Sequence, residues 1–351
     1  MRFVLVCDGI REAHLLRALN YRFHPARSAA NTGGGGGVGV VMSRAVIQES
    51  FGGPEVLEVR DVAEPHAGPG EVRVWVSAAG LNPVDWKIAG SAEAAARFGM
   101  SLPAGFGNDF AGVVDEVGDG VTGFAVGDRV YGGARAAAVA DYAVVRTGTN
   151  ELLHTPIGVN DVTASTLQIA GRTADAAISV IGVGAGDTVL IGGAAGGVGV
   201  FAVQLARRAG ARVIGTASAG AADFLRALGA EPVTYGDGLA DRVRELTRHG
   251  AVTAATDMVG TEAARAALEL GVSPDRISTI AAGGQEPAGV HATGGRDATP
   301  GALDRITAAI AAGELVVPIE ATFPIEQTRA AVELQRAGHV HGKVVITVNA
   351  A

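Results

Sequence analysis

Two glycine-rich runs in the sequence have the residue types and spacing of a loop that binds a dinucleotide. In the first run, Gly34, Gly36 and Gly39 follow the G-x-G-x-x-G pattern. The second run, IGGAAGGVGV at residues 191–200, fits it only loosely, because Ala194 stands where the first glycine is expected. Glycine lets a pyrophosphate approach the backbone, and the N-terminus of the following helix supplies unpaired N–H groups and a partial positive charge.

The elements around each run distinguish the two, because such a loop must follow a buried strand and open a helix. The first run leads into VVMSRAVIQESFGGP, which is strand-like and then broken by a Gly-Gly-Pro turn. The second follows the apolar strand Thr188–Ile191 and opens an amphipathic helix over Val200–Arg208. The next strand ends near Ser218, about 20 residues on, where a ribose-reading residue is expected. We therefore expect the cofactor at the second run and not at the first.

The composition excludes several classes of protein. The chain has 351 residues, 48% of them hydrophobic, which is enough for two domains, and its net charge of −8 argues against a nucleic-acid partner. A single cysteine, Cys7, excludes an internal disulfide framework and a cysteine-rich zinc site. No apolar stretch reaches the roughly 20 residues that span a bilayer. We expect a soluble, cytoplasmic protein with no membrane partner.

The periodicity of the chain predicts an α/β fold in two domains. Over residues 42–165, short alternating strands separated by glycine and proline turns indicate an antiparallel, partly open barrel or sandwich. Near Asp161, which could cap a helix as could Thr163, the period becomes helical. Residues 166–312 alternate strands and helices, the pattern of a doubly wound parallel sheet. Residues 313–351 return to strand character, and we expect them to cross back to the first domain.

The first 41 residues differ from the rest of the chain. They contain five arginines and two acidic residues, a charge of +3 against −11 for the remainder. We expect residues 1–41 to be a disordered or loosely attached extension, with Met42 the natural start, and their deletion to leave cofactor binding intact. An arginine-rich targeting arm is the alternative, which Asp8 and Glu12 fit poorly.

Several ordered motifs resemble one family. From Met42 to Val348 the sequence is similar to the zinc-independent branch of the medium-chain dehydrogenase/reductases, which includes quinone oxidoreductases and alkenal or enone reductases. The motifs are AGLNPVDWKIAG, GNDFAGVVDEVGDGVTGFAVGDRVYG, GRTADAA, DTVLIGGAAGGVGVFAVQLARRAGARVIGTAS, LGAEPVTY and HGKVVITV. The resemblance implies a GroES-like catalytic domain, a Rossmann domain with the nicotinamide in the cleft between them, and a homodimer.

The resemblance also implies site residues. Asn82 matches the position that faces the nicotinamide and substrate, and Thr173 matches a residue at the carboxamide end. The remaining matches are cofactor-binding positions, four in the pyrophosphate loop and two near the adenosine 2′-phosphate: Ala195, Gly196, Gly197, Val198, Ser218 and Tyr235.

The residue at the end of the second strand favours NADPH. An NAD site places an acidic residue there to bind both ribose hydroxyls, whereas GTASAGAA has none until Asp223. A lysine that the family commonly places four residues after the serine is Ala222 here, and Arg226 is a possible substitute.

The departures from the zinc branch argue against a metal site. Asn82-Pro83 replaces a cysteine, Gly107-Asn108-Asp109 replaces a Gly-His-Glu motif, and the four-cysteine loop is missing, so Lewis-acid chemistry is unsupported. Lys87, five residues after Asn82, is the other catalytic candidate, since similar enone reductases with NPVD-x-K place a lysine near the ribose and the substrate oxygen. An ammonium there could bind a developing enolate or donate a proton. The alternative for Lys87 is a surface lysine or a partner of Asp85.

The sequence thus predicts an NADPH-dependent, metal-independent reductase that transfers a hydride to a conjugated carbonyl compound or quinone. Two alternatives remain open. One is a non-catalytic NADPH-binding sensor or scaffold, and the other is a zinc-free alcohol or ketone reductase. We expect Asp85 and Asp109 to be structural, with hydrogen bonds to the loop or barrel.

Overall fold

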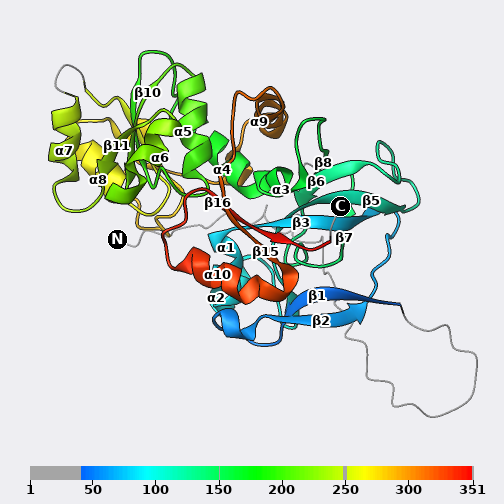
Figure 1. Cartoon of the computed structure of the whole chain (residues 1–351). Coiled ribbons are helices and arrows are strands. Elements are labelled where there is room, and N and C mark those ends of the chain that lie inside the picture. The colour runs from blue at the N-terminus through cyan, green and yellow to red at the C-terminus, as the bar shows by residue number, and fades with distance from the viewer. Residues whose placement is uncertain (1–40, 150, 248–250, 350–351) are drawn as a thin grey trace, which may run out of the picture.

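The computed structural model describes residues 41–149, 151–247 and 251–349, and these fold into three β-sheets with helices around them (Figure 1). The expectations for the first glycine run and for residues 1–40 lie outside the described residues. The first element that the structure describes after the first glycine run is a strand, β1 (Met42–Gln48). This agrees with the reading of VVMSRAVIQ as strand-like.

The N-terminal half of the chain forms a three-stranded antiparallel sheet and, together with two strands of the C-terminal segment, a seven-stranded sheet that is mostly antiparallel. The smaller has the order β2-β1-β4 and the larger β15-β16-β3-β5-β6-β8, with β7 paired to β3. The remaining strands are β2 (Glu58–Ala63), β3 (Glu71–Leu81), β4 (Ala104–Gly105), β5 (Asp109–Val117), β6 (Arg129–Gly133), β7 (Tyr142–Arg146), β8 (Leu152–His154), β15 (Ile319–Pro324) and β16 (Lys343–Thr347).

The third sheet is six-stranded and wholly parallel, with the order β11-β10-β9-β12-β13-β14. The chain starts this sheet at β9 in its centre, moves outward on one side and then outward on the other, which is the doubly wound arrangement. Its strands are β9 (Thr188–Gly192), β10 (Arg212–Ala217), β11 (Glu231–Thr234), β12 (Ala254–Asp257), β13 (Ile277–Thr279) and β14 (His291–Ala292).

Ten α-helices and five short 3₁₀ turns are found in the described residues, and none of these helices is long and apolar enough to span a membrane. The α-helices are α1 (Pro83–Ala89), α2 (Ala92–Arg97), α3 (Asp161–Ala164), α4 (Leu167–Ser179), α5 (Gly199–Arg208), α6 (Ala222–Ala227), α7 (Leu239–Leu246), α8 (Glu262–Glu269), α9 (Ala302–Ala311) and α10 (Thr328–Arg336). The 3₁₀ turns are η1 (Pro54–Val56), η2 (Ala219–Ala221), η3 (Pro274–Arg276), η4 (Gly295–Asp297) and η5 (Ile325–Gln327).

The single helix expected from Asp161 is in fact two, α3 and α4, separated at Ser165 and Thr166. At the break the chain passes close to β3, since a Cβ built on Gly80 would lie 2.2 Å from the Ser165 carbonyl oxygen. The cap also differs from both residues considered. The Asn160 side chain accepts the N–H of Thr163 at 2.8 Å, so Asn160 is the N-cap.

The C-terminal segment returns to the first half of the chain, as expected. β16 pairs antiparallel with β3, with Val344 opposite Leu81, and β15 lies parallel on its other side. The antiparallel sheets and the parallel sheet have separate apolar cores. The core between the antiparallel sheets and α10 contains Val74, Phe110 and Ile346. The parallel sheet has one core under α4 and α5, with Leu167 and Phe201, and another with Leu190 and Ile277. The strand pairing places the start of β16 beside the end of β3, where the candidate site lies.

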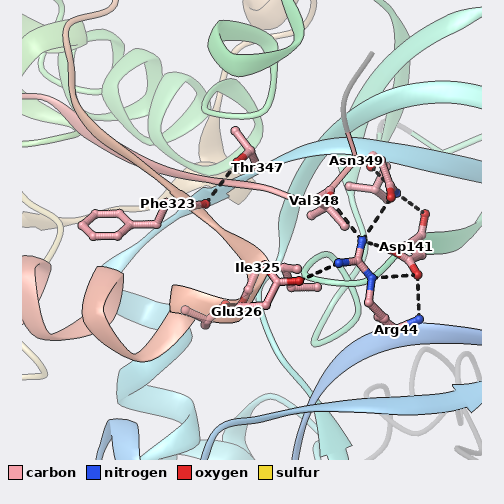
Figure 2. A network of polar contacts seen from close by, with 10 residues as sticks. Arg44, Asp141, Phe323, Ile325, Glu326, Thr347, Val348 and Asn349 are labelled. Carbon is pink, nitrogen blue, oxygen red and sulfur yellow. Dashed lines mark hydrogen bonds and ion pairs between the residues drawn. The ribbon is translucent and has the colours of Figure 1, made fainter.

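Arg44 ties the first strand to the C-terminus of the chain (Figure 2). Its guanidinium donates to Asp141 at 2.8 Å, to Glu326 at 2.7 Å and to the Val348 carbonyl oxygen at 3.2 Å. Asn349 accepts a further bond from Arg44 at 3.2 Å. The Asp141 side chain is only 10% exposed, so Arg44 neutralises a largely buried carboxylate and joins four segments far apart in sequence.

Replacement of Arg44 by methionine is expected to lower the free energy of unfolding by about 1–2 kcal/mol, because the Asp141 carboxylate would remain buried with fewer partners. Arg60→Met is the matched control. Arg60 pairs with Glu49 and Glu58 on the surface, and exposed pairs contribute about 0–1 kcal/mol. Urea unfolding followed by circular dichroism measures both. Equal losses in the two variants would show that the Arg44 network adds nothing to stability.

Candidate functional site

The second glycine run forms the turn between β9 and α5, as expected. Gly193 has a φ of +66°, which favours glycine. Gly199 is required by packing, since a Cβ there would lie 2.2 Å from the Gly193 carbonyl oxygen. Ala194 does not have a positive φ and is fully buried, with its N–H bonded to the Thr216 carbonyl oxygen. A glycine is therefore unnecessary at Ala194, which explains the departure from the G-x-G-x-x-G pattern.

The start of α5 presents unpaired backbone donors. In the part of the chain that the structure describes, the N–H groups of Gly197 and Val198 have no acceptor. A Cβ built on Gly196 would meet only the Gly193 carbonyl oxygen, at 3.4 Å, so the space in front of this residue is open. Free N–H groups, the positive end of a helix and an open glycine surface together fit a pyrophosphate.

The ends of β10 and β11 place Ser218 and Tyr235 on adjacent strands. The two strands pair in parallel with Ala217 opposite Thr234, so the next residue of each follows at the same edge of the sheet. Tyr235 is 54% exposed there. At this edge of the sheet the Arg242 guanidinium donates hydrogen bonds to the carbonyl oxygens of Thr234, Tyr235 and Gly236. A cation thus lies beside the backbone of Tyr235.

A buried polar cluster lies at the end of β3. Asn82 caps α1, and its backbone N–H donates to the Asp85 carboxylate at 2.7 Å. The Asn82 side-chain amide donates to Asp109 at 3.0 Å and accepts from the Lys343 ammonium at 2.6 Å. Asn108 donates to the other oxygen of Asp85. Asp85, Asp109 and Lys343 are 4%, 0% and 2% exposed, so three ionisable groups are enclosed together.

The cluster contacts the phosphate loop through Lys343. A Cβ built on Gly197 would lie 3.0 Å from the Lys343 Cδ and 3.9 Å from its Nζ. The preceding residue, Gly342, donates its N–H to the Ala195 carbonyl oxygen at 2.8 Å. The polar cluster, contributed by the antiparallel sheet, and the cofactor-type loop of the parallel sheet are therefore parts of one site.

The sequence and the fold match those of known proteins. A family model described as an alcohol dehydrogenase GroES-like domain matches residues 68–222, and one described as a zinc-binding dehydrogenase matches residues 197–293. The quinone oxidoreductase of Pseudomonas aeruginosa is 36% identical over 237 residues, which cover 65% of this chain and 70% of the relative.

The chain belongs to the medium-chain dehydrogenase/reductase family, in its quinone oxidoreductase branch.

Solved structures of medium-chain dehydrogenase/reductases agree with this assignment. The quinone oxidoreductase of Coxiella burnetii superposes with a TM-score of 0.78 at 29% identity, covering 88% of this chain and all of the other. A mycobacterial protein solved in complex with NADPH superposes with a TM-score of 0.75 at 28% identity, covering 87% of this chain and 99% of the other. The antiparallel half is thus the GroES-like part of the family fold and the parallel half its Rossmann-like part.

Most of the residues that the family resemblance singled out lie around this junction. Ala195, Gly196, Gly197 and Val198 form the loop. Thr173, 8% exposed, lies one turn of α4 beyond Ile169, whose N–H donates to Asp109 at 3.1 Å. Asp85 accepts a hydrogen bond from the Asn82 backbone N–H, and Asp109 accepts one from the Asn82 side-chain amide, as expected of carboxylates with a structural role.

Lys87 lies elsewhere. It is exposed on α1 and its Nζ is 5.7 Å from the centroid of the Trp86 ring. The described residues give it neither a hydrogen bond nor an ion pair with Asp85 or with any other carboxylate. The lysine that contacts Asn82 is Lys343, which sequence reasoning did not select. The available signal was its rarity, since Lys343 opens an apolar strand in a chain with only one other lysine.

The electrostatics of the cluster follow from burial. Burial raises the pKa of Asp109 to about 7, although Lys343 lowers it, while the nearby Asp85 raises it further. Burial raises the pKa of Asp85 to about 6, against the hydrogen bonds from Asn82 and Asn108 that lower it. The pKa of Lys343 is lowered by burial and raised by the two carboxylates, with a net decrease. Two carboxyl groups with raised pKa values therefore lie in one buried cluster with an ammonium whose pKa is lowered. A carboxyl group of this cluster can hold a proton near neutral pH.

Proposed function

We propose that the protein is an NADPH-dependent, metal-independent reductase that transfers a hydride from the nicotinamide to an enone or a quinone. The main support for the proposal is the contact between the glycine loop and the buried polar cluster. An open glycine loop with two free N–H groups abuts, through Lys343, the buried cluster around Asn82. Membership of the quinone oxidoreductase branch supports the class of substrate.

The residues present fit a dinucleotide. The N–H groups of Gly197 and Val198 would hold the pyrophosphate at the start of α5, with Ala195 and Gly196 completing the loop. Thr173 would lie at the carboxamide end, and Ser218 and Tyr235 at the adenosine end. When bound, a reduced nicotinamide supplies a hydride at C4 of its ring, and the protein supplies binding, orientation and electrostatics.

The preference for NADPH is supported at the edge formed by Ser218 and Tyr235. No acidic residue follows β10 to bind a ribose 2′-hydroxyl, and Arg242 offers a cation for a 2′-phosphate. Arg226, the substitute suggested by the sequence, pairs with Asp223 at 2.6 Å on the surface. Arg242 is therefore the better-placed cation.

Replacement of Arg242 by glutamine is expected to lower the preference for NADPH over NADH by about tenfold, because a charge-assisted hydrogen bond contributes about 1.5–3 kcal/mol. The ratio of kcat/KM for the two cofactors measures this, since any general loosening of the loop affects both cofactors alike. Arg226→Gln is the control, with an expected ratio close to that of the wild type. An unchanged ratio in Arg242→Gln would remove Arg242 from the 2′-phosphate site.

On the substrate side, the protein must stabilise and protonate an enolate. Protonation after hydride transfer would be completed by Lys87, from the exposed side of α1 outside the buried cluster, or by water. The positions at which the zinc branch has metal ligands here hold Asn82, Asn108 and Asp109. The Asn82 side chain bonds Asp109 and Lys343, and the Asn108 side chain bonds Asp85. No group of three or more potential His, Cys, Asp or Glu ligands occurs in the described ranges.

The proposal extends to the assembly and location of the protein. We propose a cytoplasmic homodimer that pairs the edges of the six-stranded sheets, as the family resemblance implies. The decisive experiment for the function is consumption of NADPH with and without an added quinone or enone. NADPH binding without turnover would instead favour a sensor or scaffold, and reduction of the carbonyl group would favour an alcohol or ketone reductase.

A further inference from the structure

The side-chain amide of Asn82 has a single favourable orientation in its surroundings. Its Nδ2 donates one hydrogen to the Gly80 carbonyl oxygen at 3.2 Å and the other to Asp109 Oδ2 at 3.0 Å. Its Oδ1 accepts from Lys343 Nζ at 2.6 Å. A flipped amide would place its NH₂ group against an ammonium and its oxygen against a carboxylate and a carbonyl. The surrounding charges therefore determine which way the amide points.

The backbone around Lys343 holds the ammonium in place. Lys343 donates its N–H to the Pro318 carbonyl oxygen at 2.9 Å, and its Nζ donates a second bond, at 3.0 Å, to the Leu81 carbonyl oxygen. Gly342 has a φ of +90°, and a Cβ there would lie 2.2 Å from the Pro318 carbonyl oxygen, so only glycine fits. The lysine thus reaches Asn82 from a fixed point beside the phosphate loop.

We propose that Lys343 is a positioning residue for the reaction, which together with Asp109 fixes the Asn82 amide with its oxygen toward the ammonium and its nitrogen toward the carboxylate. This inference rests on the proposed function, because the positioned group matters through the reaction that it serves. Both N–H groups of the Asn82 amide are used within the protein. Any further hydrogen bond that Asn82 makes to cofactor or substrate is therefore one that its oxygen accepts.

A purely structural role of Lys343 and a positioning role predict different results for variants of the cluster. Lys343 also balances the charge of Asp85 and Asp109, whose pKa values are raised by burial. In Lys343→Met the cluster keeps two carboxyl groups and no cation, so stability falls. In the double variant Lys343→Met with Asp109→Asn one carboxyl group is removed with the cation, and the cluster regains the net charge of the wild type. The amide of Asn82 still lacks its ammonium partner.

The experiment compares the wild type, the two single variants and the double variant. We expect Lys343→Met to lower both the urea midpoint and kcat, the latter by about 10–100-fold, the cost of a small misplacement in a reacting complex. In the double variant the urea midpoint recovers toward the wild type, while kcat stays at least tenfold below that of Asp109→Asn. Recovery of kcat together with stability, or a wild-type kcat in Lys343→Met, would overturn the proposal.

A second measurement does not depend on turnover. The side-chain NH₂ of Asn82 should exchange slowly with solvent in the wild type and at least tenfold faster in Lys343→Met, as followed by NMR of ¹⁵N-labelled protein. Lys87→Met, the same change at the chain's other lysine, should leave that exchange unaltered. Unaltered exchange in Lys343→Met overturns the positioning role even if no substrate is turned over, whereas absent turnover in the wild type overturns only the proposed function.

Discussion

Replacement of Gly196 by aspartate is expected to weaken NADPH binding by at least about 100-fold, because a like charge placed against a bound anion costs several kcal/mol. The side chain has room, since a Cβ at Gly196 meets only the Gly193 carbonyl oxygen at 3.4 Å. A carboxylate near the N-terminus of α5 also stabilises the helix. The fold should therefore be retained while the phosphate site carries a negative charge. Fluorescence titration of NADPH measures the dissociation constant.

Two controls isolate the charge and the location. Gly196→Asn has nearly the same shape without the charge, and its dissociation constant should rise far less than that of the aspartate variant. The first glycine run matches the G-x-G-x-x-G pattern more closely. Gly36→Asp makes the same change there and should leave NADPH binding unaltered. The assignment of the cofactor to residues 193–199 fails if Gly36→Asp weakens binding and Gly196→Asp does not.

Replacement of Asp109 by asparagine is expected to flatten the pH dependence of stability. The pKa of Asp109 is about 7 in the folded protein and about 3.9 in the unfolded chain. Between these values the folded state holds a proton that the unfolded state has released, so stability falls as the pH rises from about 4 to about 7, by up to about 1.4 kcal/mol per pH unit. An asparagine keeps the shape of the protonated acid and does not titrate.

The quantity compared between the wild type and the variant is the change in the free energy of unfolding with pH. In the wild type Asp109 Oδ1 is buried and has no hydrogen-bond partner in the described structure, so the asparagine NH₂ placed there lacks an acceptor and costs about 1–3 kcal/mol at every pH. Urea unfolding at pH 5 and at pH 8 gives the slope for each protein. The variant should lose less stability than the wild type over this interval, by about 2–3 kcal/mol. Equal losses would show that Asp109 carries no raised pKa.

The sequence predicted the elements around the phosphate loop because their signals are local. An apolar strand, a glycine turn and an amphipathic helix follow one another within residues 188–208, and each is readable from its own residues. The strand expected to end near Ser218 is β10 for the same reason, whereas Tyr235, which follows β11, was selected from the family resemblance. The return of the C-terminus could be expected from its strand pattern, although its pairing with β3 could not be derived from periodicity.

The polar cluster could not be predicted, because it is assembled by contacts between residues distant in sequence. Lys343 reaches Asn82 across 261 positions, and only the pairing of β16 with β3 brings them together. Lys87 was selected from the resemblance to enone reductases with NPVD-x-K, and it lies exposed on α1, outside this cluster. The close approach of Gly80 to Ser165, beside the break between α3 and α4, is likewise a contact between residues distant in sequence.

The central claim is that the chain transfers a hydride from NADPH to the carbon conjugated with a carbonyl group. Its most direct test is incubation of the protein, with residues 1–41 present or deleted, with C4-deuterated NADPH and a simple enone or quinone, followed by mass spectrometry. We predict that NADPH is consumed only when the acceptor is present, and that an enone gives a saturated ketone with deuterium at its β-carbon in both forms of the protein. No consumption across a panel of quinones and enones, or deuterium at the carbonyl carbon of an allylic alcohol, would contradict the claim.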